Sequence, residues 1–361
     1  MTVTVPHYGN SFIGLKVLFD ALGINYVIPP RSNQTALDLG VLHSPEEICN
    51  PFKLMLGNYI QSIERGADTI IIIATNGPCR FGEYASLQQR LLKKAGYSAQ
   101  FIILNTQSGK KALFEGIKKI GSHSSCSTFQ KMKALLLAIT AISLMDRIEI
   151  KLRYCSGYEK NKGECKRLLQ SCYEAVVQTN SAKDAVKILK SFKHSIKSLP
   201  LDYNKKPLKI AIIGEIYTIS DPFSSNHIED QLMDIGISTT RSLTPTWWLK
   251  DSVLKPFKLN SLSMHRAAKE YIYTCAGGYT RETVGKALLA FKKGYDGAIQ
   301  VFPVGCTPEV IAKPILEKIS SDKSFPILTL IVDEMTGEEG FITRVEAFTD
   351  MLERRREKCI I

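Results

Sequence analysis

The sequence lacks any apolar run long enough to cross a lipid bilayer. Its longest strongly apolar stretch, residues 134–145, is about a dozen residues long and is interrupted by Thr140 and Ser143, whereas a membrane-spanning helix needs roughly 20 residues. The first residues also lack the charged and then apolar pattern of a secretory signal. We therefore expect a cytoplasmic protein and not an integral membrane protein.

Several short motifs with a defined chemistry are also missing. The chain has no Cys-x-x-Cys pair, which excludes a zinc ribbon and a ferredoxin-type cluster motif. No P-loop and no Gly-x-Gly-x-x-Gly follows a predicted strand, so nucleotide binding lacks its usual signature. The six histidines are scattered, and none pairs with another at the spacing of a metal site.

The composition that is present is that of a globular protein, with 44% hydrophobic and 23% charged residues. A length of 361 residues predicts two domains, or three. Nine cysteines, an odd number, in a chain without an export signal favour thiols or metal ligands over disulfides.

The positive charge is concentrated in the middle of the chain. The whole chain carries a net charge of +12, and residues 110–209 contain 21 Lys and Arg against 8 Asp and Glu. Such a segment can attract nucleic acid, an anionic cofactor or an acidic protein. We favour a solvated helical face, and we rank nucleic-acid binding last because the segment has no interleaved aromatic residues and no recognised motif.

Two stretches of the chain predict alternating strands and helices, the pattern of a doubly wound parallel sheet in an α/β protein. In the first stretch we predict strands at 3–6, 24–28, 68–75 and 100–104 and helices at 10–22, 50–65 and 81–95. In the second we predict strands at 208–214, 235–239, 297–302 and 327–332 and helices at 225–234, 280–293, 307–320 and 343–358. The Lys-rich residues between them are mostly helical. We therefore predict domains at 1–108, 109–206 and 207–361, the middle one being the helical basic segment.

The two stretches share local motifs in addition to the order of their elements. A Gly-x-Asp motif leads into a central strand in each stretch, and a cysteine follows that strand. The motifs are Gly66-Ala-Asp68 and Gly294-Tyr-Asp296, and the cysteines are Cys79 and Cys306. A further cysteine lies about thirty residues upstream of each, at Cys49 and Cys275. We predict an internal duplication of one α/β unit, with chance similarity between two βαβ units as the alternative.

Three cysteines lie where a cofactor is expected. Ligands of an open α/β sheet bind beyond the carboxyl ends of its strands, where we predict Cys79 and Cys306. Cys49 and Cys306 each precede an N-cap residue, Asn50 or Thr307, and then a proline at the first helical position. A helix N-terminus stabilises a thiolate or an anionic cluster. Three such thiolates would suit a [4Fe-4S] cluster with one iron open to another ligand.

The other candidates have a structural alternative. A cysteine often serves as a small buried apolar residue, and we favour that role for Cys155, Cys165, Cys172 and Cys359, whereas Cys126 and Cys275 stay open. The segment Asp221-Pro-Phe223 with Asn226 and His227 could line the crevice of the second sheet. The acidic segment 333–340 is either functional or a turn that caps the final helix.

Longer motifs carry a family resemblance. They are Cys49-Asn-Pro-Phe-Lys53 with Gly57, Gly66-Ala-Asp68, Gly77-Pro-Cys79-Arg-Phe-Gly-Glu-Tyr84, Met145-Asp-Arg-Ile-Glu149 with Arg153-Tyr154, Gly214-Glu-Ile-Tyr217 to Asp221-Pro-Phe223, Gly277-Gly278 with Glu282-Thr-Val-Gly285, Asp296-Gly-Ala-Ile299 to Cys306-Thr-Pro-Glu309, and Asp333-Glu-Met-Thr-Gly-Glu-Glu-Gly340 into Thr343-Arg-Val-Glu-Ala-Phe348. With these motifs, nearly the whole chain resembles the 2-hydroxyacyl-CoA dehydratase superfamily, and in particular its branch of single-chain proteins related to acyl-CoA dehydratase activases.

The resemblance implies flavodoxin-like α/β domains and a [4Fe-4S] cluster held by Cys49, Cys79 and Cys306. Double-cubane cluster proteins are relatives, so a larger iron–sulfur cluster with Cys126 or Cys275 as additional ligands is an alternative. The resemblance also implies an ATP-hydrolysing activase-type electron donor, a small-molecule or acyl-CoA substrate at the open iron, and an anaerobic cytoplasm. It leaves a homodimer open and suggests no membrane or nucleic-acid partner.

Five further residues are expected around the cluster or its substrate: Lys53, Asn76, Arg80, Thr307 and Glu309. Lys53 and Arg80 would neutralise cluster charge or hold an anionic substrate, unless they are ordinary surface charges at a helix start. The chain departs from its relatives at Asn76, where another cysteine can occur, and at Tyr279, where a histidine is expected. A dehydratase activity is therefore not carried over, and the alternative is an accessory or regulatory subunit on the same fold, with the cluster structural or absent.

Overall fold

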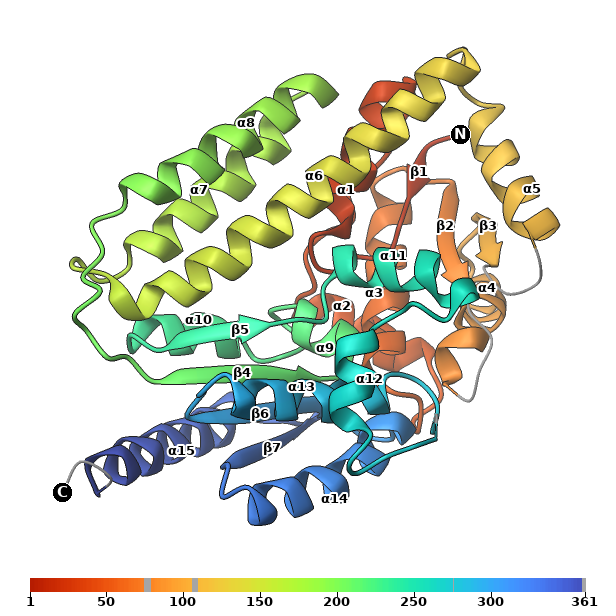
Figure 1. Ribbon diagram of the computed structural model, residues 1–361. Coiled ribbons are helices and arrows are strands. Elements are labelled where there is room, and N and C mark those ends of the chain that lie inside the picture. Colours follow the sequence, from red (N-terminus) through yellow and green to blue (C-terminus); the bar gives the residue numbers. More distant parts are fainter. Residues whose placement is uncertain (75–78, 106–109, 275, 359–361) are drawn as a thin grey trace. The chain divides into compact units, whose positions relative to one another are not determined.

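A computed structural model describes residues 1–74, 79–105, 110–274 and 276–358. The chain forms two compact units, and each contains a parallel β-sheet (Figure 1). Unit 1 comprises Met1–Met145 and Tyr173–Ser191, and unit 2 comprises Asp146–Cys172 and Phe192–Ile361. The α/β class expected from the sequence is confirmed. In the described part of the chain, no helix is both long enough and apolar enough to cross a membrane.

Unit 1 contains a three-stranded sheet in the order β1-β2-β3, with every pair parallel. Its strands are β1 (Val3–Thr4), β2 (Thr69–Ala74) and β3 (Gln100–Asn105). The central strand β2 carries the predicted run of isoleucines and is almost fully buried. The strand predicted at 24–28 is reduced to one parallel bridge between Tyr26 and Val3. Proline at positions 6, 29 and 30 explains the short pairing, because it has no N–H to donate.

The helices of unit 1 flank this sheet. They are α1 (Ser11–Leu22), α2 (Gln34–His43), α3 (Asn50–Glu64), the 3₁₀ turn η1 (Arg80–Glu83), α4 (Tyr84–Lys94) and α5 (Lys110–Gly121). Gly23 ends α1 in the left-handed conformation, as the sequence predicted. The predicted helical middle is confirmed, and its three longest helices contribute residues to both units: α6 (Thr128–Cys155), α7 (Glu164–Gln178) and α8 (Ala182–Ser195).

Unit 2 contains a four-stranded parallel sheet in the order β5-β4-β6-β7. Its strands are β4 (Lys209–Gly214), β5 (Ser238–Arg241), β6 (Gly297–Pro303) and β7 (Ile327–Val332). Its other elements are η2 (Ser156–Tyr158), η3 (Ile196–Ser198), α9 (Ile216–Ser220), α10 (Ile228–Asp234), α11 (Pro245–Leu254), η4 (Lys255–Phe257), α12 (Leu262–Ala268), α13 (Thr280–Lys292), α14 (Thr307–Asp322) and α15 (Glu338–Lys358). Helix α15 begins five residues earlier than predicted, so Glu338 and Glu339 form its first turn and are placed favourably at the helix N-terminus.

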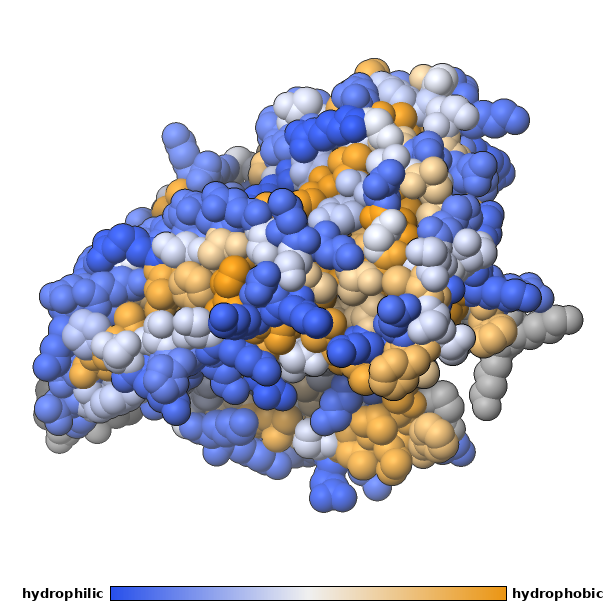
Figure 2. Space-filling view, turned by 90° about the horizontal axis from the view of Figure 1, so that it is seen from above, coloured by the Kyte–Doolittle hydropathy of each residue, from blue (hydrophilic) through white to orange (hydrophobic). Residues whose placement is uncertain are grey.

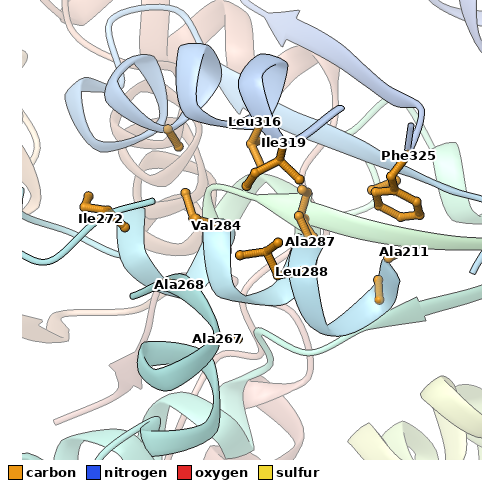
Figure 3. Close-up of a cluster of buried hydrophobic side chains, with 14 residues drawn as sticks. Ala211, Ala267, Ala268, Ile272, Val284, Ala287, Leu288, Leu316, Ile319 and Phe325 are labelled. Atoms are coloured by element: carbon orange, nitrogen blue, oxygen red, sulfur yellow. The ribbon is translucent and has the colours of Figure 1, made fainter. Parts of the chain in front are cut away.

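The core of unit 2 lies between its sheet and three helices. Figure 3 shows Val284, Ala287 and Leu288 of α13 gathered with Leu316 and Ile319 of α14. Ala211 from β4 and residues of α12 complete the cluster. This apolar layer fixes α13 and α14 against the strands, so the residues that begin these helices have defined positions at the edge of the sheet.

The two sheets share one strand order. In unit 1 the order is Tyr26, β1, β2, β3, counting the single bridge as the first position, and in unit 2 it is β5, β4, β6, β7. In both sheets, the first strand in the chain (β1 or β4) takes the second place in the sheet. The chain then adds the outer neighbour on one side (Tyr26 or β5) and afterwards the central strand on the other side (β2 or β6). The central strands β2 and β6 therefore correspond, and so do α3 and α13, which lead into them.

Two glycines occupy matching places in the two units. Gly57 on α3 and Gly285 on α13 each precede the next strand by twelve residues, and each lets a second helix pack closely. A Cβ at Gly57 would lie 1.7 Å from the Ala36 carbonyl oxygen, and one at Gly285 would lie 2.2 Å from that of Met264.

The predicted Gly-x-Asp motifs are matched in the same way. Asp68 accepts a hydrogen bond from the Thr2 N–H at 2.9 Å, and Asp296 accepts one from the Lys209 N–H at 2.7 Å. Each N–H lies at the start of the strand that neighbours the central one. The motifs therefore have a structural role at the amino edge of each sheet.

Candidate cysteine site

Each of the three cysteines predicted as ligands is the N-cap of a helical segment. Cys49 precedes α3, Cys79 precedes η1 and Cys306 precedes α14, and none of the three side chains makes a capping hydrogen bond. From the sequence, Asn50 and Thr307 were expected to be the N-cap residues. This expectation is wrong by one residue: Cys49 and Cys306 are the N-caps, because their backbone angles are extended and the next residue is already helical.

In unit 1 the segments around Cys49 and Cys79 are joined by two polar contacts. The Cys49 Sγ lies within hydrogen-bonding distance of the Tyr84 hydroxyl, and Tyr84 directly follows η1. The Arg80 guanidinium donates from Nη1 to the Glu47 carbonyl oxygen at 2.8 Å. Both cysteines thus belong to one region, at the carboxyl edge of the sheet where β2 ends and where α3, which runs back toward the start of β2, begins.

Two cations lie beside the residues that lead to Cys49. The Lys53 side chain is 1% exposed, and its ammonium donates to the Glu46 carbonyl oxygen at 2.9 Å. Arg80 is exposed and binds the adjacent carbonyl, that of Glu47. Nearby cations and the N–H groups of a helix start both stabilise a thiolate or another anion. This edge of unit 1 therefore suits a negatively charged ligand.

Tyr84 is a residue of this region that the sequence did not identify as functional. It is buried and packs edge-on against Phe52 at 5.0 Å and Phe81 at 5.2 Å between ring centroids. These rings hold its hydroxyl at the Cys49 sulfur. No local pattern could have indicated this, because Tyr84 and Cys49 are 35 residues apart.

In unit 2, Cys306 is buried and follows the central strand β6. One turn into α14, the buried carboxyl group of Glu309 accepts hydrogen bonds from Thr283 Oγ1 at 2.7 Å and Gln300 Nε2 at 2.9 Å. Burial raises the pKa of Glu309 to about 7, and the carboxylates of Glu215 and Glu282 add to that rise. Glu309 is therefore a buried structural link among α13, β6 and α14, while Thr307 is exposed.

Two further carboxylates lie near Glu309. Glu215 caps α9 by accepting hydrogen bonds from the backbone N–H groups of Tyr217 and Thr218, and burial raises its pKa. The Glu282 carboxylate, near the start of α13, forms a hydrogen bond with Nε2 of His265. The carboxyl edge of unit 2 is thus rich in carboxylates, whereas in unit 1 Lys53 and Arg80 bind the backbone carbonyls just upstream of Cys49.

The Gly277-Gly278 motif supports the start of α14. Gly278 has a φ of +51°, and a Cβ there would lie 2.3 Å from the Pro308 ring. Thr280 donates from its hydroxyl to the Pro308 carbonyl oxygen at 2.8 Å. Tyr279, which stands where a histidine was expected, packs edge-on against Trp247 at 5.1 Å. The motif therefore positions the turn that carries Cys306.

A buried ion network explains another of the quoted motifs. Arg153 on α6 pairs with Glu149 at 3.1 Å and with Asp230 at 2.7 Å, and Arg241 on β5 pairs with Glu149 at 2.9 Å and with Glu229. A shallow recess beside it is lined in part by Pro222, Ser225 and His227. A hydrogen bond to Asp230 raises the pKa of His227. The role of this loop in lining a crevice therefore stays a prediction.

The other cysteines do not join this region of unit 1 or lie outside the described residues. Cys126 contacts the Ala21 and Leu22 carbonyls at the end of α1, which is the amino edge of the sheet. Cys155, Cys165 and Cys172 are buried, and burial raises the pKa of each thiol, that of Cys172 to about 12. Asn76, Cys275 and Cys359 lie outside the described residues.

The support for an iron–sulfur cluster comes from the kind of residues present, and not from a grouping of their side chains. Thiols at helix starts with cations nearby are suitable ligands for an anionic cluster. Across the residues that the structure describes, no three His, Cys, Asp or Glu side chains are grouped as the ligands of a metal ion would be. No protein-family model matches the chain, and no curated protein is significantly similar to it.

Proposed function

We propose that this chain is an iron–sulfur protein of the 2-hydroxyacyl-CoA dehydratase type, from the branch related to the activases. Its [4Fe-4S] cluster would be held by Cys49, Cys79 and Cys306, with one iron open to a small substrate. Electrons of low potential would come from an ATP-hydrolysing activase-type partner, in an anaerobic cytoplasm. The observation that carries the proposal is that Cys49, Cys79 and Cys306 each stand at the N-cap of a helical segment.

The surroundings of Cys49 support this proposal. The Tyr84 hydroxyl can donate to the sulfur, and the buried Lys53 and the exposed Arg80 bring positive charge to the preceding carbonyls. These groups would favour a deprotonated, ligating Cys49. A bound cluster would supply one-electron chemistry and a Lewis-acidic iron. The residues of this chain would hold it, balance its charge and limit the access of water.

We also propose that the two units are duplicated flavodoxin-like domains. Both strand orders match the first four positions of the flavodoxin order, 2-1-3-4. The pairs Gly57 and Gly285, and Asp68 and Asp296, have the same contacts at equivalent positions. A chance similarity of two βαβ units would not require these side-chain roles to agree.

A substitution series tests the cluster proposal. Cys49→Ser, Cys79→Ser and Cys306→Ser would each be purified under strict anaerobic conditions, reconstituted with iron and sulfide, and examined by absorption and electron-paramagnetic resonance spectroscopy. Each variant is expected to lose most of the broad absorption near roughly 400 nm. Cys172→Ser, which changes a buried thiol away from any helix start, is the matched control and should keep it.

The alternative is a non-catalytic accessory or regulatory subunit on the same fold. A wild-type protein that stays colourless after anaerobic reconstitution would favour it. Loss of the spectrum in Cys172→Ser as well as in the three candidate variants would mean that the signal reports folding and not ligation.

A further inference from the structure

Helix α6 has two apolar faces in unit 1, and only one of them is packed. On the packed face, Ala134, Ala138 and Ala141 are buried. Helix α1 comes so close there that a Cβ at Gly14 would lie 2.1 Å from the Ile142 side chain. A surface helix normally turns polar residues to the solvent on the side opposite its packed face. The second face of α6 therefore needs an explanation.

The second face carries five exposed apolar side chains, which we call the α6 stripe. They are Phe129, Met132, Leu135, Leu136 and Ile139, with exposed fractions of 78%, 57%, 46%, 59% and 36%. Apolar residues also form patches among hydrophilic ones on the molecular face seen in Figure 2. Stripes of this size on soluble proteins commonly mark a binding surface.

The spacing of the α6 stripe fits another helix. Phe129, Met132, Leu136 and Ile139 follow the alternating three- and four-residue spacing of a and d positions in a heptad, and Leu135 falls at a g position. Such a narrow seam is the pattern of a helix pair, whereas lipid binding favours a broad apolar face.

Charge decides which helix would bind. The segment of sequence that contains the α6 stripe, 114–140, has four lysines and a single acidic residue, Glu115. Lys133 falls at an e position, directly beside the stripe, and is exposed, as are Lys118 and Lys119. Flanking charges at e and g positions determine partner choice. A second copy would bring two Lys133 side chains and their positively charged segments together, while an acidic helix would neutralise this charge.

We propose that the α6 stripe binds an amphipathic helix of a partner protein whose apolar face is bordered by Asp and Glu. This inference does not depend on the iron–sulfur cluster. Binding would cover the apolar residues of α6 and weaken as salt rises, because the bordering ion pairs are screened.

The test uses the full-length protein and two fluorescent synthetic helices of three heptads. Both peptides carry Leu at a and d; one carries Glu at e and g and the other carries Lys there. We expect the Glu peptide to bind at least about tenfold more tightly than the Lys peptide. Leu136→Glu should weaken Glu-peptide binding by at least about tenfold. Gln130→Glu, the same charge change on an exposed neighbour outside the stripe, should have little effect.

Four results would overturn the proposal. Equal affinity for the two peptides would remove the charge argument, and unchanged affinity in Leu136→Glu would remove the α6 stripe as the site. A dimer in sedimentation velocity that Leu136→Glu abolishes would make a second copy the occupant. Binding to phosphatidylserine vesicles, lost in Leu136→Glu and without binding of the Glu peptide, would make the occupant a membrane surface.

Discussion

The two units make matching hydrogen bonds at the amino edges of their sheets, but the carboxyl edges of the two sheets differ in charge. At the amino edges, Asp68 and Asp296 receive a hydrogen bond from the first residues of the neighbouring strand. At the carboxyl edges, Lys53 and Arg80 in unit 1 bind the two backbone carbonyls just upstream of Cys49, while Cys306 in unit 2 is followed by the buried Glu309 and its neighbouring carboxylates. The matching contacts stabilise each sheet, whereas the two carboxyl edges differ in charge.

Substitution of the helix-packing glycines tests the shared scaffold and should have the largest effect. Gly57→Ala and Gly285→Ala would each force a Cβ into a backbone carbonyl of the packed helix. Each is expected to lower the free energy of unfolding by about 3 kcal/mol or more. Chemical denaturation followed by circular dichroism measures this.

The control for both glycines is Gly340 in α15, where a Cβ would contact nothing within 4 Å. Gly340→Ala should be neutral or stabilise by about 0.5–1 kcal/mol. A strong effect at only one of Gly57 and Gly285 would break the correspondence between α3 and α13.

Alanine substitution of the two aspartates should lower the free energy of unfolding by different amounts, although both side chains accept matching hydrogen bonds. Asp296 binds the Lys209 N–H and both oxygens contact Arg356 at 2.7 and 2.8 Å, so Asp296→Ala should cost about 2 kcal/mol of unfolding free energy. Asp68 is 57% exposed, so Asp68→Ala should cost less than about 1 kcal/mol. Thermal and denaturant unfolding would measure both, and a larger cost at Asp68 would contradict this account.

The carboxylate-rich edge of unit 2 should give stability an unusual pH dependence. Burial raises the pKa of Glu309 from the ordinary 4.5 of a glutamate to about 7, so the folded state keeps a proton that the unfolded state releases. The contribution of Glu309 is therefore complete below about pH 4.5 and is lost as the pH rises to about 7.

Glu309→Gln should remove this decline in unfolding free energy between about pH 4.5 and 7. The control is Glu317→Gln on the exposed side of α14. If wild type and Glu309→Gln have parallel stability curves over this range, Glu309 does not titrate as described.

At Tyr84 in unit 1 the expected effect is on the reactivity of a cysteine and not on stability. Tyr84→Phe removes the hydroxyl beside the Cys49 sulfur and should slow alkylation of Cys49 by iodoacetamide at neutral pH by about tenfold. Mass spectrometry of the cluster-free protein would follow the rate at each cysteine. Tyr97→Phe, which removes a hydroxyl bonded to Glu64, should leave the rate unchanged; an equal rate in Tyr84→Phe would remove its proposed role.

The sequence predicted the central strands and most long helices because their patterns are local. The isoleucines at 70–73 and the prolines two residues after Cys49 and Cys306 are examples. It missed α2, whose apolar residues are interrupted by Asp38 and Gly40, and Gly40 is explained only by its close approach to Lys53 on α3. Helices α9, α11 and α12 were also missed, because two of them are short and their start signals lie within irregular segments.

The candidate site was predictable in its residue types but not in its surroundings. The cysteines could be placed at helix starts from the residues that follow them. The Tyr84 contact, the burial of Lys53 and the links from Glu309 to Thr283 and Gln300 all join residues that are distant in the sequence or on different elements. Tertiary packing creates these contacts, so no short pattern encodes them.

The most direct test of the central claim is the iron and acid-labile sulfide content of the wild-type protein, prepared and reconstituted without oxygen. A single [4Fe-4S] cluster gives about four iron and four sulfide per chain, and we expect this content. About eight of each would indicate a double-cubane cluster and would require further ligands, with Cys275 to be tested first because Cys126 lies at the opposite edge of the sheet. A protein that binds no iron after reconstitution would contradict the claim and leave a scaffold without cluster chemistry.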